Sequence, residues 1–577
     1  MSRLNGGTLL AKSLAALGVT EAFALHGGHM DALLVACADE GIRLTDTRHE
    51  ATAGYAAEAY ARATQQIGVA VITAGPGFTN GLTALADAFL DAAPILVISG
   101  SPPLREAETN PLQGGFDLVA MATPVTKWAH RITNVERIPD LVDKAVRIAL
   151  SGRPGPVFLE VPIDIMFGPL AGDMPPLPAT PTLASRPAPT ADAVDYILEL
   201  IAGSQRPAII AGGGAASPRC AELLTRLAER TGVPVVLSGK ANGVLPTDHP
   251  LNLGSAGVLA ETAVGVQQQA DLIIQLGARA GLFLGGRSGI IIPDAAKLVQ
   301  IDLDASEIGR LRAPDVAIVA DAGETIKALL DAIGEREFPS FEPWVGLLGQ
   351  VRAAGQMAFA EAPHETEAGL IHPFHAARAI VEALSPDTAI ATDGGESSSW
   401  FNMLGRSAGP GLYQGTGYLG TLGIGQGFAI GLARAAEDRP VAAIMGDGAV
   451  GFHIAEFDTM ARHNLPILTI IFNNAAWGMS LHGQELVFGA NRTAAVHLAH
   501  SAYHQVAQGL GCAGEEIRKV EDIGPAIRRA QDSGKPTCLN ILTDPAVAHP
   551  ITEAMIGELD NPNEIAIPYY ENIPLHK

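Results

Sequence analysis

The chain has 577 residues, with 38 lysines and arginines against 61 aspartates and glutamates, and therefore a formal charge of −23. At roughly 150 residues per domain this length predicts three or four domains. Apolar residues make up 47% and charged residues only 17%, which excludes a disordered protein. The negative charge disfavours nucleic acid and anionic membranes as general partners. An anionic cofactor could still bind where backbone N–H groups or a metal ion offset that charge.

The cysteines are few and far apart in the sequence. Cys37, Cys220, Cys512 and Cys538 form no C-x-x-C pair, which disfavours a disulfide framework and a thiolate zinc site and is typical of a reducing cytoplasm. The N-terminus lacks the apolar core of a signal peptide, and no apolar run reaches the roughly 18 residues of a transmembrane helix. The sequence therefore predicts a soluble, cytoplasmic protein.

Two changes in composition divide the chain. Residues 168–189 contain seven prolines, too many for a helix or a central strand, and they predict an extended linker. Glutamate, proline and phenylalanine interrupt the pattern again and predict a second linker at 335–364. The expected units are a first domain at 1–167, a central domain at 190–334, a third domain at 365–545 and a C-terminal tail at 546–577.

Each unit alternates helical patterns with short apolar runs. Strands are expected at 69–73, 95–98, 208–211, 233–237, 272–276, 298–301, 388–392, 442–445 and 467–472, and a helix at 82–90. Continuous apolar strands that alternate with helices indicate parallel sheets covered on both faces. We therefore predict an α/β protein of three consecutive doubly wound domains, with ligands beyond the carboxyl ends of the strands.

Polar residues directly follow two expected strands of the third domain. Gly446-Asp447-Gly448 follows the strand at 442–445, and Asn473-Asn474 follows the strand at 467–472. Asp447 and Asn474 offer oxygen ligands of the kind that Mg²⁺ or Ca²⁺ prefers, and the glycines let backbone N–H groups approach a phosphate. Either motif alone is most often a turn. Together, at two strand ends, they predict a site for a diphosphate and a metal ion.

This pair of motifs resembles the cofactor motif of the thiamine diphosphate (ThDP) enzymes, which opens with Gly-Asp-Gly and closes with Asn-Asn. The resemblance implies a first domain that binds the pyrimidine ring of the cofactor and a third domain that binds its diphosphate. It implies Mg²⁺ ligands from the side chains of Asp447 and Asn474 and from the backbone carbonyl of Ala476. The implied cofactor-binding residues are Gly395, Glu396, Gly420, Leu422, Gly446, Asp447, Gly448, Ala449 and Asn474.

Two further features of the family have counterparts in this chain. Glu50 begins a helix-forming stretch and matches the glutamate that protonates the aminopyrimidine ring, although alone it would be read as a helix's first-turn glutamate. The stretch 417–422 resembles the segment in which a bulky residue, here Leu422, bends the cofactor. In that segment of the family a backbone carbonyl, here that of Gly420, accepts a hydrogen bond from the exocyclic amino group of the cofactor. The loop at 75–80 resembles the family's first-domain loop.

Several segments resemble benzaldehyde lyase in particular, namely 25–29, 46–50, 112–113, 126–130, 417–420 and 474–478. This match implies that His29 is an acid/base relay to the substrate hydroxyl. It also implies that Gln113 is a polar partner of the bound substrate oxygen. Without the match, His29 would be read as an ordinary loop histidine.

The expected substrate pocket departs from that enzyme. It would contain Gly28, Ile163, Ser398, Trp477 and Glu485. Ile163 stands where benzaldehyde lyase has a tryptophan, Ser398 where it has a tyrosine, Glu485 where it has a glutamine, and Gly28 where it has an alanine. Because two aromatic walls are missing, a pocket for stacked benzene rings is not expected.

The tail carries Tyr569 and Tyr570 among prolines, which is not typical of a disordered terminus. Two interpretations stay open. The tail is either a strap packed on a neighbouring subunit or a lid over the active site. A C-terminal lid is found in CoA-thioester members of the superfamily such as oxalyl-CoA decarboxylase.

The smaller, more polar pocket and the tail favour a 2-hydroxyacyl-CoA lyase that yields an aldehyde or ketone and formyl-CoA. An aliphatic acyloin lyase or carboligase is the first alternative. A pyruvate-using acetolactate synthase is the second, and His29 argues against it. An inactive subunit that serves assembly is disfavoured because Glu50, Asp447 and Asn474 are all present.

Glu50 and Asp447 lie in different expected domains although both must contact one cofactor. In the family the site forms between two subunits, so the resemblance implies a homodimer or a homotetramer. In the central domain, the glycines at 212–214 and Asp302 end two expected strands, where an ADP or CoA moiety could bind. Ordinary turn chemistry is the preferred interpretation of these residues, and FAD is not expected.

Overall fold

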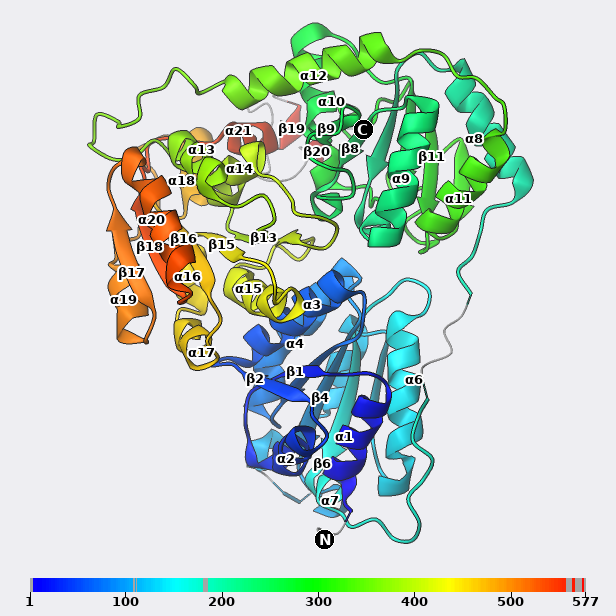
Figure 1. The fold of residues 1–577 in the computed structure, drawn as a ribbon, viewed down its shortest axis with the longest axis vertical. Coiled ribbons are helices and arrows are strands. Elements are labelled where there is room, and N and C mark those ends of the chain that lie inside the picture. Colours follow the sequence, from blue (N-terminus) through cyan, green and yellow to red (C-terminus); the bar gives the residue numbers. More distant parts are fainter. Residues whose placement is uncertain are drawn as a thin grey trace.

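The computed structural model describes residues 4–106, 109–110, 112–179, 185–556, 563–565 and 573–574. These residues form three consecutive domains, each built on a six-stranded, wholly parallel sheet with helices on both faces (Figure 1). The first domain, blue to cyan in Figure 1, lies below the central domain (green) and the third domain (yellow to orange). The predicted α/β architecture of three doubly wound domains is confirmed. Among the described helices, none is long and apolar enough to cross a membrane.

The first domain has the strand order β2-β1-β3-β4-β6-β5. Chain order reverses between β1 and β3, and ligands in such sheets bind beyond the carboxyl ends of the strands at this reversal. The strands are β1 (Glu21–Ala24), β2 (Arg43–Asp46), β3 (Gly68–Ile72), β4 (Ile95–Ser101), β5 (Trp128–Arg131) and β6 (Val157–Pro162). The helices are α1 (Gly6–Ala16), α2 (Asp31–Asp39), α3 (Glu50–Thr64), α4 (Pro76–Asp91), α5 (Leu118–Ala122), α6 (Ile138–Leu150) and α7 (Ile163–Met166).

The central domain has the order β12-β11-β10-β7-β8-β9, with the reversal between β7 and β10. Its strands are β7 (Pro207–Ala211), β8 (Val235–Leu237), β9 (Asn252–Ser255), β10 (Leu272–Leu276), β11 (Lys297–Asp302) and β12 (Val316–Val319). Its helices are α8 (Ala191–Gly203), α9 (Pro218–Thr231), α10 (Gly257–Val266) and α11 (Ala322–Ile333).

The segment 335–364, which the sequence predicted as a linker, contains helix α12 (Glu342–Met357). Trp344 and Leu348 of this helix are buried in a hydrophobic cluster with central-domain residues, and the Trp344 indole donates to the Pro207 carbonyl at 3.0 Å. Pro343 interrupts the apolar pattern of the sequence, but it lies in the first turn of α12, where proline is well tolerated. This part of the segment is therefore packed on the central domain.

The third domain repeats the topology of the first, with the order β14-β13-β15-β16-β18-β17 and the reversal between β13 and β15. Its strands are β13 (Ala389–Asp393), β14 (Tyr413–Gly415), β15 (Val441–Gly446), β16 (Ile467–Asn473), β17 (Ala513–Ile517) and β18 (Thr537–Leu542). Its helices are α13 (Pro373–Ala383), α14 (Glu396–Leu404), α15 (Ile424–Ala435), α16 (Asp447–Phe452), α17 (Glu456–Arg462), α18 (Gly478–Phe488), α19 (Tyr503–Gly509) and α20 (Val520–Ser533).

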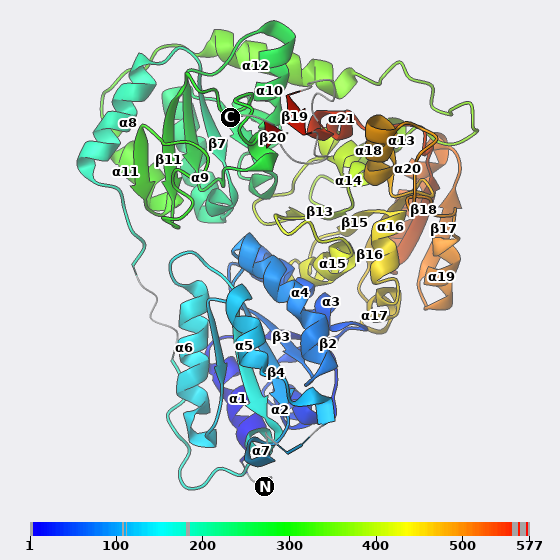
Figure 2. The same ribbon diagram turned by 180° about the vertical axis from the view of Figure 1, so that it is seen from behind.

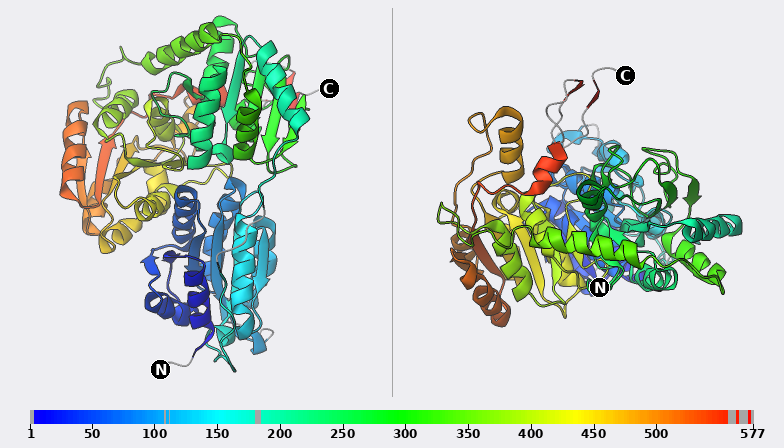
Figure 3. Two further views of the ribbon diagram at one scale, coloured as in Figure 1. Left: turned by 45° about the vertical axis from the view of Figure 1, so that its right-hand side comes forward. Right: turned by 90° about the horizontal axis from the view of Figure 1, so that it is seen from above.

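The tail begins with helix α21 (Pro550–Ile556), and a short antiparallel pair, β19 (Glu564–Ile565) and β20 (Ile573–Pro574), follows. Figure 2 shows α21 from behind, between α14 and α18 of the third domain and α10 of the central domain, and Figure 3 gives two further views. Tyr569 and Tyr570, which prompted the interpretation of the tail as a strap or a lid, lie outside the described residues.

Every strand predicted from an apolar run is present, and the predicted helix at 82–90 lies within α4. The strands that the sequence did not reveal include most edge strands of the sheets, namely β5, β9, β12, β14 and β17, whereas Ile42 and Leu44 gave a short strand-like signal at β2. An edge strand has a neighbour on one side only and is less buried, so it needs no continuous apolar run. β2 illustrates this, because Arg43, Leu44 and Asp46 are all at least partly exposed.

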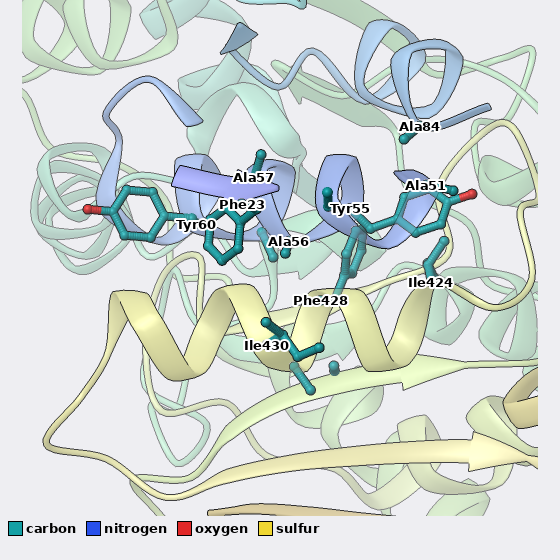
Figure 4. Close-up of a cluster of buried hydrophobic side chains, with 14 of the residues drawn as sticks. Phe23, Ala51, Tyr55, Ala56, Ala57, Tyr60, Ala84, Ile424, Phe428 and Ile430 are labelled. Atoms are coloured by element: carbon teal, nitrogen blue, oxygen red, sulfur yellow. The ribbon is translucent and has the colours of Figure 1, made fainter. Parts of the chain in front are cut away.

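The first and third domains meet along α3 and α15, which lie side by side (Figure 4). A Cβ added to Gly427 would lie 2.7 Å from the Cβ of Tyr55, and one added to Gly431 would lie 2.2 Å from the Ala56 carbonyl oxygen. The rings of Tyr55 and Phe428 meet edge to face, with centroids 6.4 Å apart. Small residues therefore let the two helix backbones approach more closely than ordinary side chains would allow.

Three buried carboxylates lie where all three domains meet. Oxygens of Glu58, Asp87 and Asp91 lie within 4.8 Å of one another. Lys240 of the central domain reaches Asp91 at 2.5 Å, and Arg62 lies 3.4 Å from Glu58. Burial, with the neighbouring carboxylates, raises the pKa of Asp87 to about 6 and that of Glu58 well above its usual value. Two cations thus face three carboxylates, which leaves one negative charge without a partner. Folding therefore favours the protonated form of Asp87.

Asp87→Asn should therefore change stability in a pH-dependent way. In the wild type the folded state binds a proton at Asp87 between about pH 4 and 6 that the unfolded chain has released, so stability falls as pH rises through this window. Asparagine removes the charge and can still accept the hydrogen bond from Thr421. Relative to wild type, the free energy of unfolding of Asp87→Asn should be on the order of 1–3 kcal/mol higher at pH 8 than at pH 4.5, so the variant is relatively more stable at the higher pH.

Denaturant unfolding at the two pH values measures this difference. The exposed Asp331→Asn substitution is the matched control and should show no such pH dependence. An equal effect of Asp87→Asn at both pH values would contradict the prediction.

Candidate active site

Loops after β13, β15 and β16 meet at one edge of the third sheet. These loops, at 394–396, 446–448 and 474–477, line a cavity of about 2340 Å³ that continues across the central domain. A pocket for one drug-sized ligand measures roughly 300–1,000 Å³, so the cavity has room for more than one chemical group.

Most of the residues predicted to bind cofactor, metal or substrate line this cavity. They come from four segments that are far apart in the sequence, and parallel strands bring them together because their carboxyl ends share one edge. These residues are Gly395, Glu396, Ser398, Gly420, Leu422, Gly446, Asp447, Gly448, Ala449, Asn474, Ala476 and Trp477.

Asp447 begins α16 and is almost fully buried. One carboxylate oxygen accepts from the Gly448 N–H at 2.9 Å, whereas the other is buried without a hydrogen-bond partner. Burial raises the pKa of Asp447 to about 7, because an uncompensated charge is costly away from water. A divalent cation would compensate this charge, and Asn474 and the Ala476 carbonyl provide the further oxygens that Mg²⁺ prefers. The residues present therefore fit the implied metal ion.

Glycines let the loop at 474–477, which holds the predicted metal ligands Asn474 and Ala476, lie close to the start of α16. A Cβ added to Gly448 would lie 2.4 Å from a ring carbon of Trp477, and one added to Gly446 would lie 2.9 Å from the Ser397 hydroxyl. Trp477 also meets Phe452 edge to face, with centroids 6.1 Å apart. Residue 448 must be glycine for the indole to keep this position.

A second group of predicted residues lies at the carboxyl edge of the first sheet. Glu50 begins α3 directly after His49, whose side chain caps the helix by accepting from the Ala51 N–H. The Asn80 amide donates to the Glu50 carboxylate at 3.0 Å, and a Cβ added to Gly77 would lie 3.3 Å from the other carboxylate oxygen. Residues 76–80, which the sequence predicted as a loop, instead form the start of α4 after the N-cap Gly75, and this first part of the helix packs against Glu50.

His29 lies beside the end of β4, and Gln113 lies beside Gly75 at the N-terminus of α4. A Cβ added to Gly100 would lie 2.6 Å from the Cβ of His29, and one added to Gly75 would lie 2.6 Å from the Cβ of Gln113. Burial lowers the pKa of His29, so the ring is neutral at pH 7 and can accept a proton. Gln113 has a left-handed backbone (φ 62°), and its amide oxygen is buried without a partner. Both features are typical of a residue held for a ligand.

The two groups do not meet within one chain. Among the described residues, those that line the cavity do not include Glu50, His29 or Gln113. They do not include three predicted pocket residues either, namely Gly28 in the turn after β1, Ile163 at the start of α7 and Glu485 on α18. A single chain therefore carries two separate parts of the predicted site.

The C-terminal segment contributes cavity residues that the sequence analysis missed, namely Thr543, Asp544, Val547, Ile551, Ala554 and Met555. Thr543 and Asp544 directly follow β18, so a search of strand ends would have found them if β18 had been recognised. No local pattern points to the contribution of α21, which depends on where the tail folds back. The predicted tail thus forms part of the cavity wall.

Ser398 and Glu396 differ in how their side chains are used. The Ser398 hydroxyl is buried without a partner, so it is available to a ligand in the cavity. The Glu396 carboxylate already accepts hydrogen bonds from His482 and Thr552. Glu396 is also the first residue of α14, where unpaired backbone N–H groups favour a phosphate.

The central-domain part of the cavity lies beyond the carboxyl ends of β7 and β10. It is lined by glycines of the predicted nucleotide position, by Asp302 and by several basic residues, namely Gly213, Gly214, Arg153, Arg186, Arg219, Arg279 and Arg287. Tyr418, from the loop of Gly420 and Leu422, donates to the Arg279 carbonyl at 2.9 Å, and the Arg279 guanidinium lies 4.7 Å from the centre of its ring. The predicted cofactor loop therefore contacts the central domain directly.

Comparison with known families gives three consecutive matches. Residues 4–121 match the N-terminal TPP binding domain of thiamine pyrophosphate enzymes, residues 194–329 their central domain and residues 393–541 their C-terminal TPP binding domain. Thiamine pyrophosphate is another name for ThDP.

Named relatives fall into two groups of similar identity. The acetolactate synthase large subunit IlvG of Mycobacterium tuberculosis is 32% identical, over 95% of this chain and 97% of its own. The 2-hydroxyacyl-CoA lyase 2 of Caenorhabditis elegans is 32% identical, over 92% of this chain and 88% of its own. The human protein of the same name is 30% identical, over 93% and 90%. Identity therefore does not separate the two activities.

Asp447→Asn should abolish tight binding of metal and cofactor, since it removes the buried charge that a cation would neutralise. The dissociation constant for ThDP in the presence of Mg²⁺ should rise by about a hundredfold or more, as expected when a charge-assisted contact of about 3 kcal/mol is lost. Trp477 lies against Gly448, so quenching of its fluorescence during a titration measures binding. The exposed Asp438→Asn substitution should bind like wild type. Unchanged affinity of Asp447→Asn would contradict the metal assignment.

Proposed function

The chain belongs to the thiamine pyrophosphate enzyme family, and from this premise we propose that it is a ThDP- and Mg²⁺-dependent carbon–carbon lyase. The favoured substrate is a 2-hydroxyacyl-CoA, which is cleaved between its carbonyl carbon and its hydroxyl-bearing carbon. The products are an aldehyde or ketone and formyl-CoA. The substrate hydroxyl loses one proton and the acyl carbon gains one, so substrate and products have the same overall composition. ThDP, when bound, supplies a nucleophilic carbon that accepts and releases the acyl group.

One observation carries the CoA form of this proposal. The cavity is continuous from the cofactor residues Asp447 and Asn474 to a wall that contains Arg153, Arg279 and Arg287. Guanidinium groups suit the phosphates of a CoA or ADP moiety. The volume of about 2340 Å³ leaves room for a pantetheine arm as well as the cofactor. An acyloin without CoA would leave this part of the cavity without a role. FAD is not part of the proposal.

Three first-domain residues would perform the proton chemistry. Glu50, oriented by Asn80, would hold a proton at the aminopyrimidine ring. His29, neutral at pH 7, would take the proton from the substrate hydroxyl as the carbon–carbon bond breaks. Gln113 would donate from its amide group to the substrate oxygen.

The substrate would be recognised mainly by small and apolar groups. Ser398 offers a buried hydroxyl, and Ile551 and Met555 of α21 add apolar surface beside it in the same cavity. Trp477, whose ring packs against Gly448, lines the same cavity. Gly28, Ile163 and Glu485 do not line this cavity. We keep them in the proposed pocket, which is completed only when a second subunit is added.

A complete site requires a second copy of the chain. Glu50, His29 and Gln113 form one half, whereas Asp447 and Asn474 line the cavity of the other half. We therefore propose a homodimer, or a homotetramer built from dimers, in which the first domain of one subunit faces the third domain of its partner.

Two other activities share these residues and are kept as alternatives. A benzaldehyde-lyase-like acyloin lyase or carboligase would use the same half-sites without CoA. An acetolactate synthase is kept because the Mycobacterium tuberculosis relative of that name is 32% identical, the same identity as the Caenorhabditis elegans 2-hydroxyacyl-CoA lyase 2.

Parallel incubations with ThDP and Mg²⁺ distinguish the three activities. Release of formyl-CoA and acetone from 2-hydroxyisobutyryl-CoA, detected by mass spectrometry, supports the CoA lyase. Benzaldehyde from benzoin without formyl-CoA would replace it with an acyloin lyase. Carbon dioxide and acetolactate from pyruvate would replace it with an acetolactate synthase.

Glu50→Gln should lower kcat by about 10²–10⁴-fold, because glutamine cannot deliver a proton to the ring. It should leave the dissociation constant of ThDP within about tenfold of the wild-type value, since glutamine can still hydrogen-bond to the ring and the proposed diphosphate and metal contacts at Asp447 and Asn474 are unchanged. Rapid-quench turnover and the Trp477 fluorescence titration measure the two quantities. Retained turnover would contradict the role of Glu50.

A further inference from the structure

A buried ion pair lies behind the cofactor end of the cavity. Glu396 and His482 each have 4% of their side-chain surface exposed, and Nδ1 of His482 lies 2.8 Å from both Glu396 carboxylate oxygens. The Thr552 hydroxyl donates to one of these oxygens at 2.5 Å. The other ring nitrogen of His482 lies 2.7 Å from the Pro545 carbonyl oxygen.

These partners determine the charge of His482. A carboxylate and a backbone carbonyl can only accept hydrogen bonds, so both ring nitrogens of His482 must carry a proton. Burial alone would lower the pKa of His482, but the hydrogen bond and charge of Glu396, together with the Pro545 carbonyl, raise it. His482 is therefore an imidazolium that connects Glu396 to the C-terminal segment.

The ion pair joins three elements that surround the cavity. Glu396 begins α14, directly after the loop that the cofactor assignment places at Gly395. His482 lies in α18, which begins directly after the metal-binding loop at 474–477. Thr552 lies in α21, and Pro545 lies in the segment that leads to it. Figure 1 shows α14, α18 and α21 next to one another.

The space between the ion pair and the metal-binding loop is small. A Cβ added to Gly478 would lie 3.1 Å from a Glu396 carboxylate oxygen and 2.9 Å from the Asn474 amide nitrogen. Both side chains therefore pack around Gly478, and we expect a displacement of Glu396 to displace Asn474 as well. On the other side, α21 presents Ile551, Ala554 and Met555 to the cavity.

We propose that Glu396, His482 and Thr552 are positioning residues that dock α21 on the cofactor loops, so that binding of the cofactor and ordering of the C-terminal segment support each other. This inference rests on the proposed function only for the identity of the cofactor. It gives Glu396 a role in addition to the predicted contact with the cofactor.

Amide hydrogen exchange of the full-length protein tests this docking, with peptides that cover 546–556 measured with and without ThDP and Mg²⁺. Thr552→Val keeps the side-chain shape but removes the donor, and exchange in α21 should become about tenfold or more faster, as expected for a lost hydrogen bond to a charged group. Thr552→Ser keeps the hydroxyl and should restore slow exchange. Glu553→Gln, an exposed change on the same helix, should match wild type.

Two results decide the proposal. In the wild type, ThDP with Mg²⁺ should slow exchange of α21, and Thr552→Val should reduce that slowing and weaken ThDP binding by about three- to tenfold. Equal exchange of α21 in Thr552→Val and wild type would overturn the docking role. Equal exchange with and without cofactor in the wild type would overturn the coupling. Neither result depends on turnover, so a failure of the proposed lyase activity would be recognised separately.

Discussion

The close contact between α3 and α15 fixes the relative position of the first and third domains. Both helices begin at loops assigned to the cofactor, α3 at Glu50 and α15 directly after the loop that holds Gly420 and Leu422. Because Gly427 and Gly431 let the backbones touch, the two helices cannot shift without steric clashes. This contact sets where the two halves of the site lie and keeps Glu50 away from the cavity of its own chain.

The central domain is joined to this pair through charges and one aromatic residue. Lys240 neutralises Asp91 at the junction of the three domains, and Thr421 of the cofactor loop donates to Asp87. Tyr418, in the same loop, contacts Arg279 of the central domain. A ligand that moved Arg279 would therefore act on the loop of Gly420 and Leu422. The central domain therefore forms part of the cavity wall and contacts the loop of Gly420 and Leu422 directly.

Much of the site could be predicted because its chemistry lies at strand ends. Gly446-Asp447-Gly448 and Asn474 directly follow buried apolar strands, and such strands are the clearest signal in a parallel sheet. The edge strands gave no such signal, since they are less buried and carry polar side chains. The helix α12 was not predicted because Pro343 was read as a helix breaker, whereas proline is equally compatible with the first turn of a helix, where it lies here. His482 and Thr552 could not be found, because their partner, Glu396, is more than 80 residues away in the sequence.

The sequence by itself determined the type of domain and the cofactor motifs, because each depends on residues next to one another or on the period of burial along a strand; the metal ligands Asp447, Asn474 and Ala476 stay a prediction from the family resemblance. The tertiary structure decided which of these residues share a cavity, that Glu50, His29 and Gln113 form a separate group, and that α21 closes one wall. Those features depend on packing between helices such as α3 and α15. Packing is set by surface shape and buried charge across distant segments, and no local pattern of residues encodes it.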